Sequence, residues 1–468
     1  MVQIPILSGI FSDGAADFRT SMPVNLVPVP KAQGISNGYL RPADGLVQVA
    51  TGPGLDRGGI NWRGVHYRVM GTNLVTVSSA GVVTVLGDVG NDGSPATLDY
   101  GFDYLAIASA GSLFYWDETT LTQVTDLDLG TVNDVLWVDG YYMTTDGEFL
   151  VVTDLNDPFA VNPLKYGSSE ADPDPIVAIL KIRNEVAALN RHTIEFFDNV
   201  GGQLFPFQRI EGAQIEKGCV GKDACCIYLD AIAFLGSGFN EAPGVYIGAN
   251  GSAPKISTRE VDTLLLAYTE DELALAVMEA RNDKANQLLY IHLPDRTLVY
   301  DAAATQAVGE PAWHVLTTGL DGFSRYPARG FVFVYDGWYA GNPMSNVVCR
   351  TDDTLSSHYG AEVRWEFATG IVYNASAGAV FHSLELIGLP GRVAFGDAPY
   401  IDTSYSFDGV EWSQARSISA GVQGQRQKRL AWFQQGSMRN WRVQRFRGTS
   451  DAFMSFARLE ARLEPLAW

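Results

Sequence analysis

The sequence has little positive charge and lacks any long apolar run. Lys and Arg number 33 against 53 Asp and Glu, so the formal net charge at pH 7 is −20. A protein that grips nucleic-acid phosphates needs the opposite balance, so stable DNA binding is not expected. No run approaches the roughly 18 apolar residues of a membrane span, so no membrane segment is expected either.

Cysteine is scarce, with only Cys219, Cys225, Cys226 and Cys349 in 468 residues. The set contains an adjacent pair but no Cys-x-x-Cys, which fits neither a disulfide framework nor a zinc site. We therefore expect reduced, buried thiols. Residues 1–12 lack the basic region and the small-residue cleavage site of a signal peptide, which favours a chain made and kept in a cytoplasm.

Signals for catalysis and for bound cofactors are also missing. The six histidines are scattered and none has the spacing of a metal-ligand pair. Residues 88–93 superficially resemble a calcium loop, but they lack the closing bidentate glutamate and are interpreted as an Asx-rich turn. The sequence predicts no catalytic residue, no metal site, no cofactor and no enzymatic activity.

Glycine and apolar residues are plentiful. The chain has 48 glycines, 46% hydrophobic residues and 11% aromatic residues, which predicts a mainly β, turn-rich protein with a large core. Between residues 56 and 355, pairs of short strands with tight joints recur every 30–60 residues or so. This pattern predicts a β-propeller of six or seven blades, with a pair of β-sandwiches as the alternative.

The two ends of the chain differ from this middle part. Residues 1–55 are dense in proline and glycine and are expected to form an extended N-terminal arm, over the surface or onto a neighbouring subunit. Residues 356–468 are expected to form a C-terminal β-sandwich, because alternating strands resume there.

One strong helix signal interrupts the strand pattern at residues 269–281. Thr269 is an N-cap candidate, Glu272 completes a capping box, and Glu270 and Asp271 place negative charge at the helix start. A stripe at helical spacing is expected to pack on the propeller: Leu273, Ala276, Val277 and Ala280.

Two regions resemble one family. Residues 268–301, and the opening Pro-Val-Asn-Leu at 23–26 followed by Gly-Tyr-Leu-Arg at 38–41, with Pro42 and Gly45, are similar to the packaged-DNA stabilisation or tail hub proteins of short-tailed bacteriophages. The resemblance implies a structural virion protein of the tail, assembled in the host cytoplasm.

That family's role is carried out by assembly. The resemblance implies a homo-oligomer, expected to be a hexamer, that forms a ring below the portal and its adaptor. Such a ring closes the DNA channel, stabilises the packaged genome and encloses DNA without binding it specifically. The implied partners are the tail adaptor ring, a tail needle or plug, and tailspikes or tail fibres.

Charge is unevenly distributed along the chain. Residues 88–174 contain 17 acidic residues and one basic residue. This acidic span is either a solvated face with Asp in turns or a channel wall that repels DNA. The candidate channel-facing residues are Asp117, Glu118, Asp126 and Asp128.

From residue 411 to the end, 10 basic residues stand against 4 acidic ones. Arg442, Arg445 and Arg447 alternate with Val443 and Phe446 closely enough for a protected strand edge. The alternative is a docking surface for an acidic neighbour.

A second function class remains open from sequence alone. A propeller-type glycosidase or carbohydrate-binding protein would use exposed aromatic residues, for which Trp116, Trp137, Trp338 and Trp412 are candidates. A glycosidase also needs two carboxylates at a defined separation, which 53 acidic residues cannot exclude. The sequence shows no arginine cluster of the sialidase kind in its propeller half.

Overall fold

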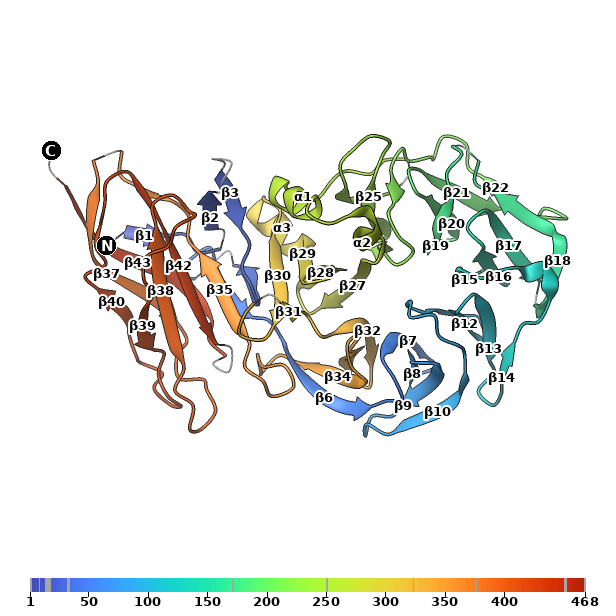
Figure 1. The fold of residues 1–468 in the computed structure, drawn as a ribbon, viewed down its shortest axis with the longest axis horizontal. Coiled ribbons are helices and arrows are strands. Elements are labelled where there is room, and N and C mark those ends of the chain that lie inside the picture. Colours follow the sequence, from blue (N-terminus) through green and yellow to red (C-terminus); the bar gives the residue numbers. More distant parts are fainter. Residues whose placement is uncertain are drawn as a thin grey trace.

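The computed structural model describes residues 2–7, 9–12, 18–31, 34–155, 157–170, 172–249, 251–322, 324–375, 377–449 and 453–466. Within these ranges the chain is mainly β and forms a propeller and a sandwich, which lie side by side in Figure 1. Both labelled chain ends lie at the sandwich side of the molecule.

In the described ranges, seven sheets of four or five strands surround the centre of the propeller (Figure 1). The first sheet contains β7 (Asp56–Trp62), β8 (Val65–Met70), β9 (Asn73–Val77) and β10 (Val83–Asp88), and the second contains β11 (Thr97–Tyr100), β12 (Leu105–Ser109), β13 (Ser112–Trp116) and β14 (Leu121–Gln123). The third sheet contains β15 (Asp134–Val138), β16 (Tyr141–Thr145), β17 (Phe149–Asp154) and β18 (Asp157–Ser168). The fourth contains β19 (Ile176–Ile182), β20 (Glu185–Asn190), β21 (Ile194–Asn199) and β22 (Phe207–Arg209).

The fifth sheet contains β23 (Gly218–Cys219), β24 (Cys225–Tyr228), β25 (Ala231–Ser237) and β26 (Gly244–Gly248). The sixth contains β27 (Val277–Asp283), β28 (Asn286–His292), β29 (Thr297–Asp301), β30 (Trp313–Thr318) and β31 (Ser324–Arg325). The seventh contains β32 (Arg329–Val334), β33 (Gly337–Gly341), β34 (Val347–Asp352) and β6 (Gly45–Thr51). This arrangement confirms the propeller and excludes the pair of β-sandwiches over residues 56–355.

Tight turns with positive φ join neighbouring strands, as the sequence predicts. They include Gly71 at φ 61°, Ala110 at 49°, Asp139 at 49° and Asp336 at 58°. Positive φ is inexpensive for Gly and tolerated by Asp, so these turns can keep the strands they join in register.

Strand β6 closes the propeller. It precedes the first sheet in sequence, yet it pairs antiparallel with β34 of the last sheet, with Ala50 opposite Val348. The outer strand of the last sheet therefore comes from the other end of the domain. The ring cannot open without breaking this pairing.

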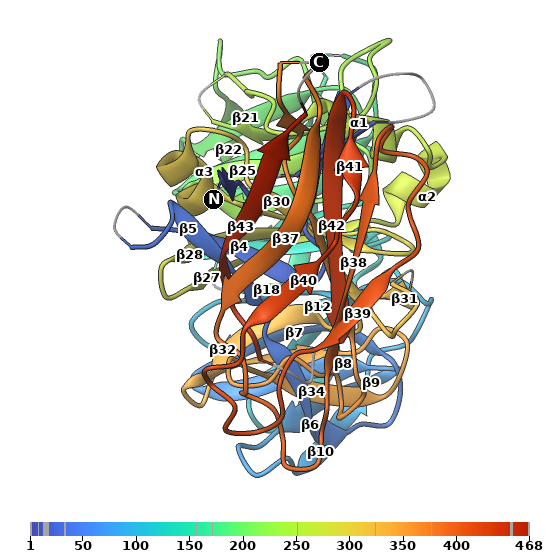
Figure 2. The same ribbon diagram turned by 90° about the vertical axis from the view of Figure 1, so that its left-hand side faces the viewer.

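Two sheets form the sandwich (Figure 2). One contains β1 (Val2–Ile4), β4 (Leu26–Pro30), β5 (Gly38–Pro42), β37 (Ala379–Gly388), β40 (Leu430–Phe433), β41 (Ser437–Met438) and β43 (Phe456–Pro465); the other contains β35 (Arg364–Ala368), β36 (Val372–Tyr373), β38 (Tyr400–Ser406), β39 (Arg416–Ser419) and β42 (Trp441–Thr449). A separate hairpin consists of β2 (Gly9–Ser12) and β3 (Phe18–Ser21).

The predicted N-terminal arm differs from the observed segment. Its described part is extended, but β1 and β5 pair with β43 in the sandwich, and β6 pairs in the propeller. Backbone groups of an extended segment need partners, and these strands find them within the same chain. Residues 1, 8, 13–17, 32 and 33 of this segment, and 376, 450–452, 467 and 468 of the predicted sandwich, lie outside the described ranges.

The predicted helix over residues 269–281 is wrong in its extent. Two short helices, α1 (Arg259–Leu265) and α2 (Glu270–Ala274), precede β27, which takes the rest of the predicted span. The capping box is present, because Thr269 and Glu272 bond each other's backbone N–H groups. Beyond Leu275 the chain pairs with β28, since a single short helix is marginal without tertiary support. The other described helices are η1 (Leu127–Leu129) and α3 (Ala302–Val308).

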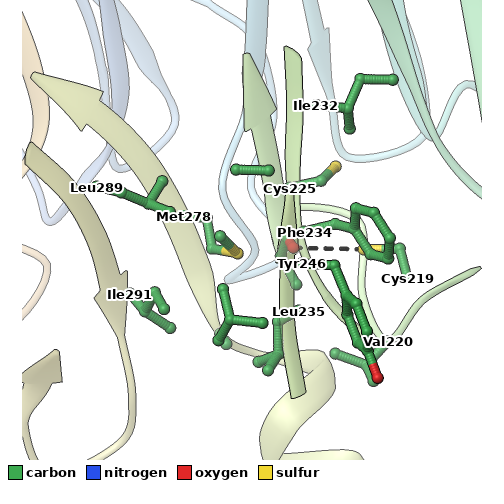
Figure 3. Close-up of a cluster of buried hydrophobic side chains, with 14 of the residues drawn as sticks. Cys219, Val220, Cys225, Ile232, Phe234, Leu235, Tyr246, Met278, Leu289 and Ile291 are labelled. Atoms are coloured by element: carbon green, nitrogen blue, oxygen red, sulfur yellow. Dashed lines mark hydrogen bonds between the residues drawn. The ribbon is translucent and has the colours of Figure 1, made fainter. Parts of the chain in front are cut away.

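The largest core cluster spans β19 to β30 (Figure 3). Cys219 and Cys225 lie inside it beside Phe234, Tyr246 and Met278. All four cysteines are free thiols, three of them buried and Cys226 partly exposed. Burial also raises the pKa of Cys349 to about 11, so that thiol stays protonated at neutral pH.

Candidate functional site

The family-like opening of the sequence lies at the joint between propeller and sandwich. Val24 N–H donates to the Glu366 carbonyl at 2.9 Å, and Val315 N–H donates to the Pro23 carbonyl at 2.8 Å. Residues 23 and 24 therefore bridge β30 of a propeller sheet to β35 of the sandwich.

Asn25 completes this joint. It is buried and has φ 53°, a conformation that Asn tolerates better than most residues. Its side-chain amide donates to the Arg364 carbonyl at 2.7 Å, and its Oδ1 accepts from Thr317 N–H at 3.0 Å. The side-chain amide of Asn25 thus forms hydrogen bonds with both domains. The Pro-Val-Asn-Leu motif alone does not predict these contacts.

A second buried network joins the first and last propeller sheets. Asp56 and Arg68 form a two-pronged ion pair at 2.6 and 2.7 Å, with both side chains fully buried. Gly341 of β33 leaves room for it, because a Cβ there would lie 2.0 Å from the Asp56 carboxyl carbon. Arg68 also donates to the Gly330 carbonyl at 3.1 Å. The pair therefore links β7 and β8 to β32.

The neighbouring seam is held by Glu279 and His292. His292 Nε2 lies 2.6 Å from Glu279 Oε1, and the same carboxylate accepts from Gly330 N–H at 3.1 Å and Phe331 N–H at 2.7 Å. Burial alone would raise the pKa of Glu279, but these hydrogen bonds outweigh it and lower the pKa. The ionised carboxylate stabilises the contact between the sixth and seventh sheets.

The predicted acidic residues lie in connections and not on strands: Asp117 and Glu118 between β13 and β14, and Asp126 and Asp128 at η1. Asp117 and Glu118 are exposed on the hairpin between β13 and β14. A hydrogen bond from the Thr119 hydroxyl, with others from backbone N–H groups, lowers the pKa of Asp117. Glu118 forms an ion pair with Arg63.

Asp126 is not a free surface carboxylate. It is half-buried, caps η1 by accepting from Asp128 N–H at 3.0 Å, and accepts from Val161 N–H at 3.2 Å. Asp128 is exposed. Of the four candidate channel residues, three are available at the surface and one has a structural role.

Arg442 does not belong to any docking surface, so that part of the prediction is wrong. Its side chain is fully buried, with its guanidinium carbon 4.2 Å from the Phe381 ring centroid and 3.8 Å from that of Tyr405. The two-residue period of β42 places it on the same face as Gln444 and Phe446. The two-residue alternation along this strand could therefore have indicated from the sequence that Arg442 lies on the buried face.

Arg445 and Arg447 remain partly accessible and converge on one carboxylate. Arg447 Nε lies 2.6 Å from Glu366 Oε2, and Arg445 stacks 4.0 Å from the Trp412 ring centroid. Arg364 also pairs with Glu366, and Arg445 Nη1 lies 3.9 Å from Glu366 Oε1. Three guanidinium groups thus share one carboxylate near the joint between the domains.

The predicted packing stripe divides between two elements. Leu273 of α2 and Ala276 are buried, while Val277 and Ala280 lie on β27 and are partly buried. Leu275, between them, is 75% exposed. The short helix packs on the core through Leu273 and is followed by the buried Ala276, so the predicted helical stripe does not form.

The candidate aromatic residues do not form an exposed platform. Trp116 is buried in the core, and Trp137, Trp338 and Trp412 are partly buried. The described ranges contain no group of three His, Cys, Asp or Glu side chains that could hold a metal ion. In the same ranges, no helix is long and apolar enough to cross a membrane.

The calcium-like segment at residues 88–93 forms successive Asx turns. Asp88, Asn91 and Asp92 each accept from the backbone N–H two residues further on, at 2.8–2.9 Å. The Asx-rich interpretation of this segment is confirmed.

Comparisons with known proteins cover both parts of the chain. The family model described as bacteriophage P22 Gp10, beta-propeller, matches residues 2–356, and that described as bacteriophage P22 Gp10, beta-sandwich, matches residues 364–464. The tail hub protein gp10 of Salmonella phage P22 is 29% identical over 465 residues, covering 93% of this chain and 94% of the relative.

Solved structures are more distant. The Pan2 WD40 domain of Neurospora crassa has a TM-score of 0.43 at 9% identity, covering 66% of this chain and 96% of that one. PorZ of the Porphyromonas gingivalis type-IX secretion system has a TM-score of 0.40 at 13% identity, covering 80% and 46%. The two family models, matched in order along one chain, show that this protein belongs to the bacteriophage P22 Gp10 family, which confirms the resemblance of residues 23–45 and 268–301.

Proposed function

We propose that this protein is a structural tail hub component of a short-tailed bacteriophage virion, without enzymatic activity. The observation that carries the proposal is the similarity to a tail hub protein over 93% of the chain, through both propeller and sandwich. A function that depends on one domain would not require both to match in order.

The finer role is assembly into a ring, expected to be a hexamer, below the portal and its adaptor. Large apolar side chains at the surface are available for contact with partners: Leu127 is 95%, Phe395 93% and Phe102 78% exposed. The adaptor ring, a needle or plug, and tailspikes or tail fibres are the partners we propose. The closed propeller offers a rigid unit for such a ring, because β6 and the Asp56–Arg68 pair lock its seam.

The ring would enclose DNA and retain the genome without gripping it. The net charge of −20 and the exposed Asp117, Glu118 and Asp128 support a wall that repels phosphates. Assembly in the host cytoplasm is compatible with four free thiols, because disulfides are rare in reducing compartments.

Mass photometry tests the assembly proposal. At low salt the free protein should be a monomer, because strongly acidic subunits repel one another. With the phage's adaptor complex it should form particles that hold several copies. One copy per particle at every adaptor concentration would contradict the ring.

A glycan panel tests the absence of catalysis. We expect neither turnover nor saturable binding, because Trp116 is buried and the other three candidate tryptophans are only partly exposed. Release of reducing sugar from any glycan would support a glycosidase instead.

A further inference from the structure

A cavity of about 710 Å³ opens at the propeller axis. Its walls are the connections that enter the innermost strands and the turns between second and third strands, so all seven sheets contribute. Examples are Gly71, Ala110, Asn133, Val177 and Pro343. This volume is typical of small-molecule sites.

Some of the charged side chains of this axial pocket already have partners. Arg57 is occupied, since it donates to Asp92 at 2.9 Å and to the carbonyls of Ser94 and Gly90, both at 2.7 Å. Asp56 is paired with Arg68. Both therefore belong to the framework of the pocket.

The remaining charged groups of the pocket wall are three cations and one acid. Lys222, Arg325 and Arg329 face Asp223 around the cavity. Lys222 donates to the Pro95 carbonyl at 3.1 Å, and Arg329 makes one long contact of 3.5 Å with the Asp56 carbonyl. In a chain of net charge −20, this is a concentration of positive charge.

Arg325 is the least satisfied of the three. Its Nε is buried and has no hydrogen-bond partner among the described residues. Burial, reinforced by the Arg329 charge, lowers the pKa of Arg325. Two guanidinium groups that repel each other beside an open cavity would both be stabilised by an anion between them.

We propose that the axial pocket binds a small polyanion through Arg325, Arg329 and Lys222, with phosphate or carboxylate groups as the chemistry recognised. Guanidinium groups match the planar edges of both groups, and the ammonium of Lys222 adds a third contact. Because the cavity exceeds the size of one phosphate ion, a molecule with two or more anionic groups fits it better. This inference does not depend on ring assembly.

Isothermal titration calorimetry on the full chain tests the site. The probes are inorganic phosphate and citrate in chloride buffer of constant ionic strength. We expect one saturable site per chain, with citrate tighter than phosphate if carboxylates are preferred and the reverse if phosphate is preferred. No saturable heat with either probe would overturn the proposal.

Matched variants locate the site. Arg325→Gln should weaken binding about tenfold, as expected for loss of one charge-assisted contact. Arg426→Gln, which removes one charge from an exposed position in the sandwich, should leave the affinity unchanged. Equal effects of the two substitutions would show non-specific attraction and reject the site.

A variant that binds the anion more tightly than the wild type cannot be explained by a folding defect. Asp223 is surrounded by Lys222, Asp134, Arg329 and Asp92, and burial raises its pKa to about 6. At pH 7.5 it is ionised and repels an anion. Asp223→Asn should therefore tighten binding by about threefold or more at pH 7.5 and change it little at pH 5.5. Weaker binding in this variant would contradict the proposed charge arrangement.

Discussion

At the residue scale, buried charged side chains of this protein differ in the partners that stabilise them. Asp56 stabilises the buried Arg68, whereas Arg442 has two aromatic faces and carbonyl oxygens but no carboxylate among its described partners. Burial lowers the pKa of Arg442 to about 9 for that reason. Such residues make the fold sensitive to pH and to substitution.

His66 should make stability fall as the solution is acidified. Burial, with the Arg68 charge beside it, lowers its pKa to about 2, so it stays neutral in the fold. Below about pH 6.5 the unfolded chain binds a proton that the folded chain cannot, which costs about 1 kcal/mol per pH unit. His66→Gln should therefore show a shallower loss of melting temperature than the wild type between pH 7.5 and 5.5.

The control for this prediction is His382→Gln. The His382 side chain is 46% exposed and pairs with Glu464. Its profile should follow that of the wild type. Parallel profiles for all three proteins would show that His66 does not set the pH dependence.

At the element scale, long-range strand pairing decides the local structure. Strand β27 replaces the C-terminal part of a predicted helix, and β6 leaves the N-terminal segment to close the last sheet. Each strand gains backbone hydrogen-bond partners from one neighbouring strand, which a short isolated helix or arm does not have. The seam between first and last sheets is then the element on which the ring depends.

Asp56→Ala should destabilise that seam by about 3–5 kcal/mol, because it leaves Arg68 buried without its carboxylate. Adding Arg68→Met removes the unpaired charge and should recover part of the loss. Thermal unfolding and protease susceptibility of the two single variants and the double variant measure this coupling. Additive losses in the double variant would show that the two side chains do not depend on each other.

At the scale of the whole molecule, charge is separated between an acidic part of the propeller and a more basic C-terminal part. The acidic span holds 17 acidic residues and one basic residue, and Glu366 at the joint gathers Arg364, Arg445 and Arg447. From this separation we infer that the propeller faces DNA and that the sandwich contacts other proteins. The accessible parts of Arg445 and Arg447 are the remaining candidates for that docking surface.

Reversing charge at three exposed positions should create DNA affinity. Asp117→Lys, Glu118→Lys and Asp128→Lys together add positive charge with little loss of stability, since exposed substitutions usually cost less than about 0.5 kcal/mol. Asp126 is left intact because it caps η1. A gel-shift titration at physiological salt should show duplex DNA retarded by this variant only.

The matched control carries Asn or Gln at the same three positions, which removes the negative charge without adding positive charge. It should not retard DNA. If the wild-type protein itself retards duplex DNA at physiological salt, the repelling wall is wrong and a direct DNA clamp replaces it.

Local patterns in the sequence determined much of this protein by themselves. Alternating strands, positive-φ turns and the Thr269–Glu272 capping box involve residues within a few positions of each other, so their physics is visible without a fold. Four cysteines without a framework spacing likewise indicated the free thiols that the structure contains.

Only the tertiary structure decided which distant groups meet. The end of α2, the partners of β5 and β6, the burial of Arg442 and the two-domain contacts of Asn25 all depend on strands far apart in sequence. Asn25 and Thr317 are 292 positions apart, and no local pattern encodes their hydrogen bond. Pairing and burial are set by the packing of the whole chain, because a backbone or charged group is stable in the interior only where its partner also arrives.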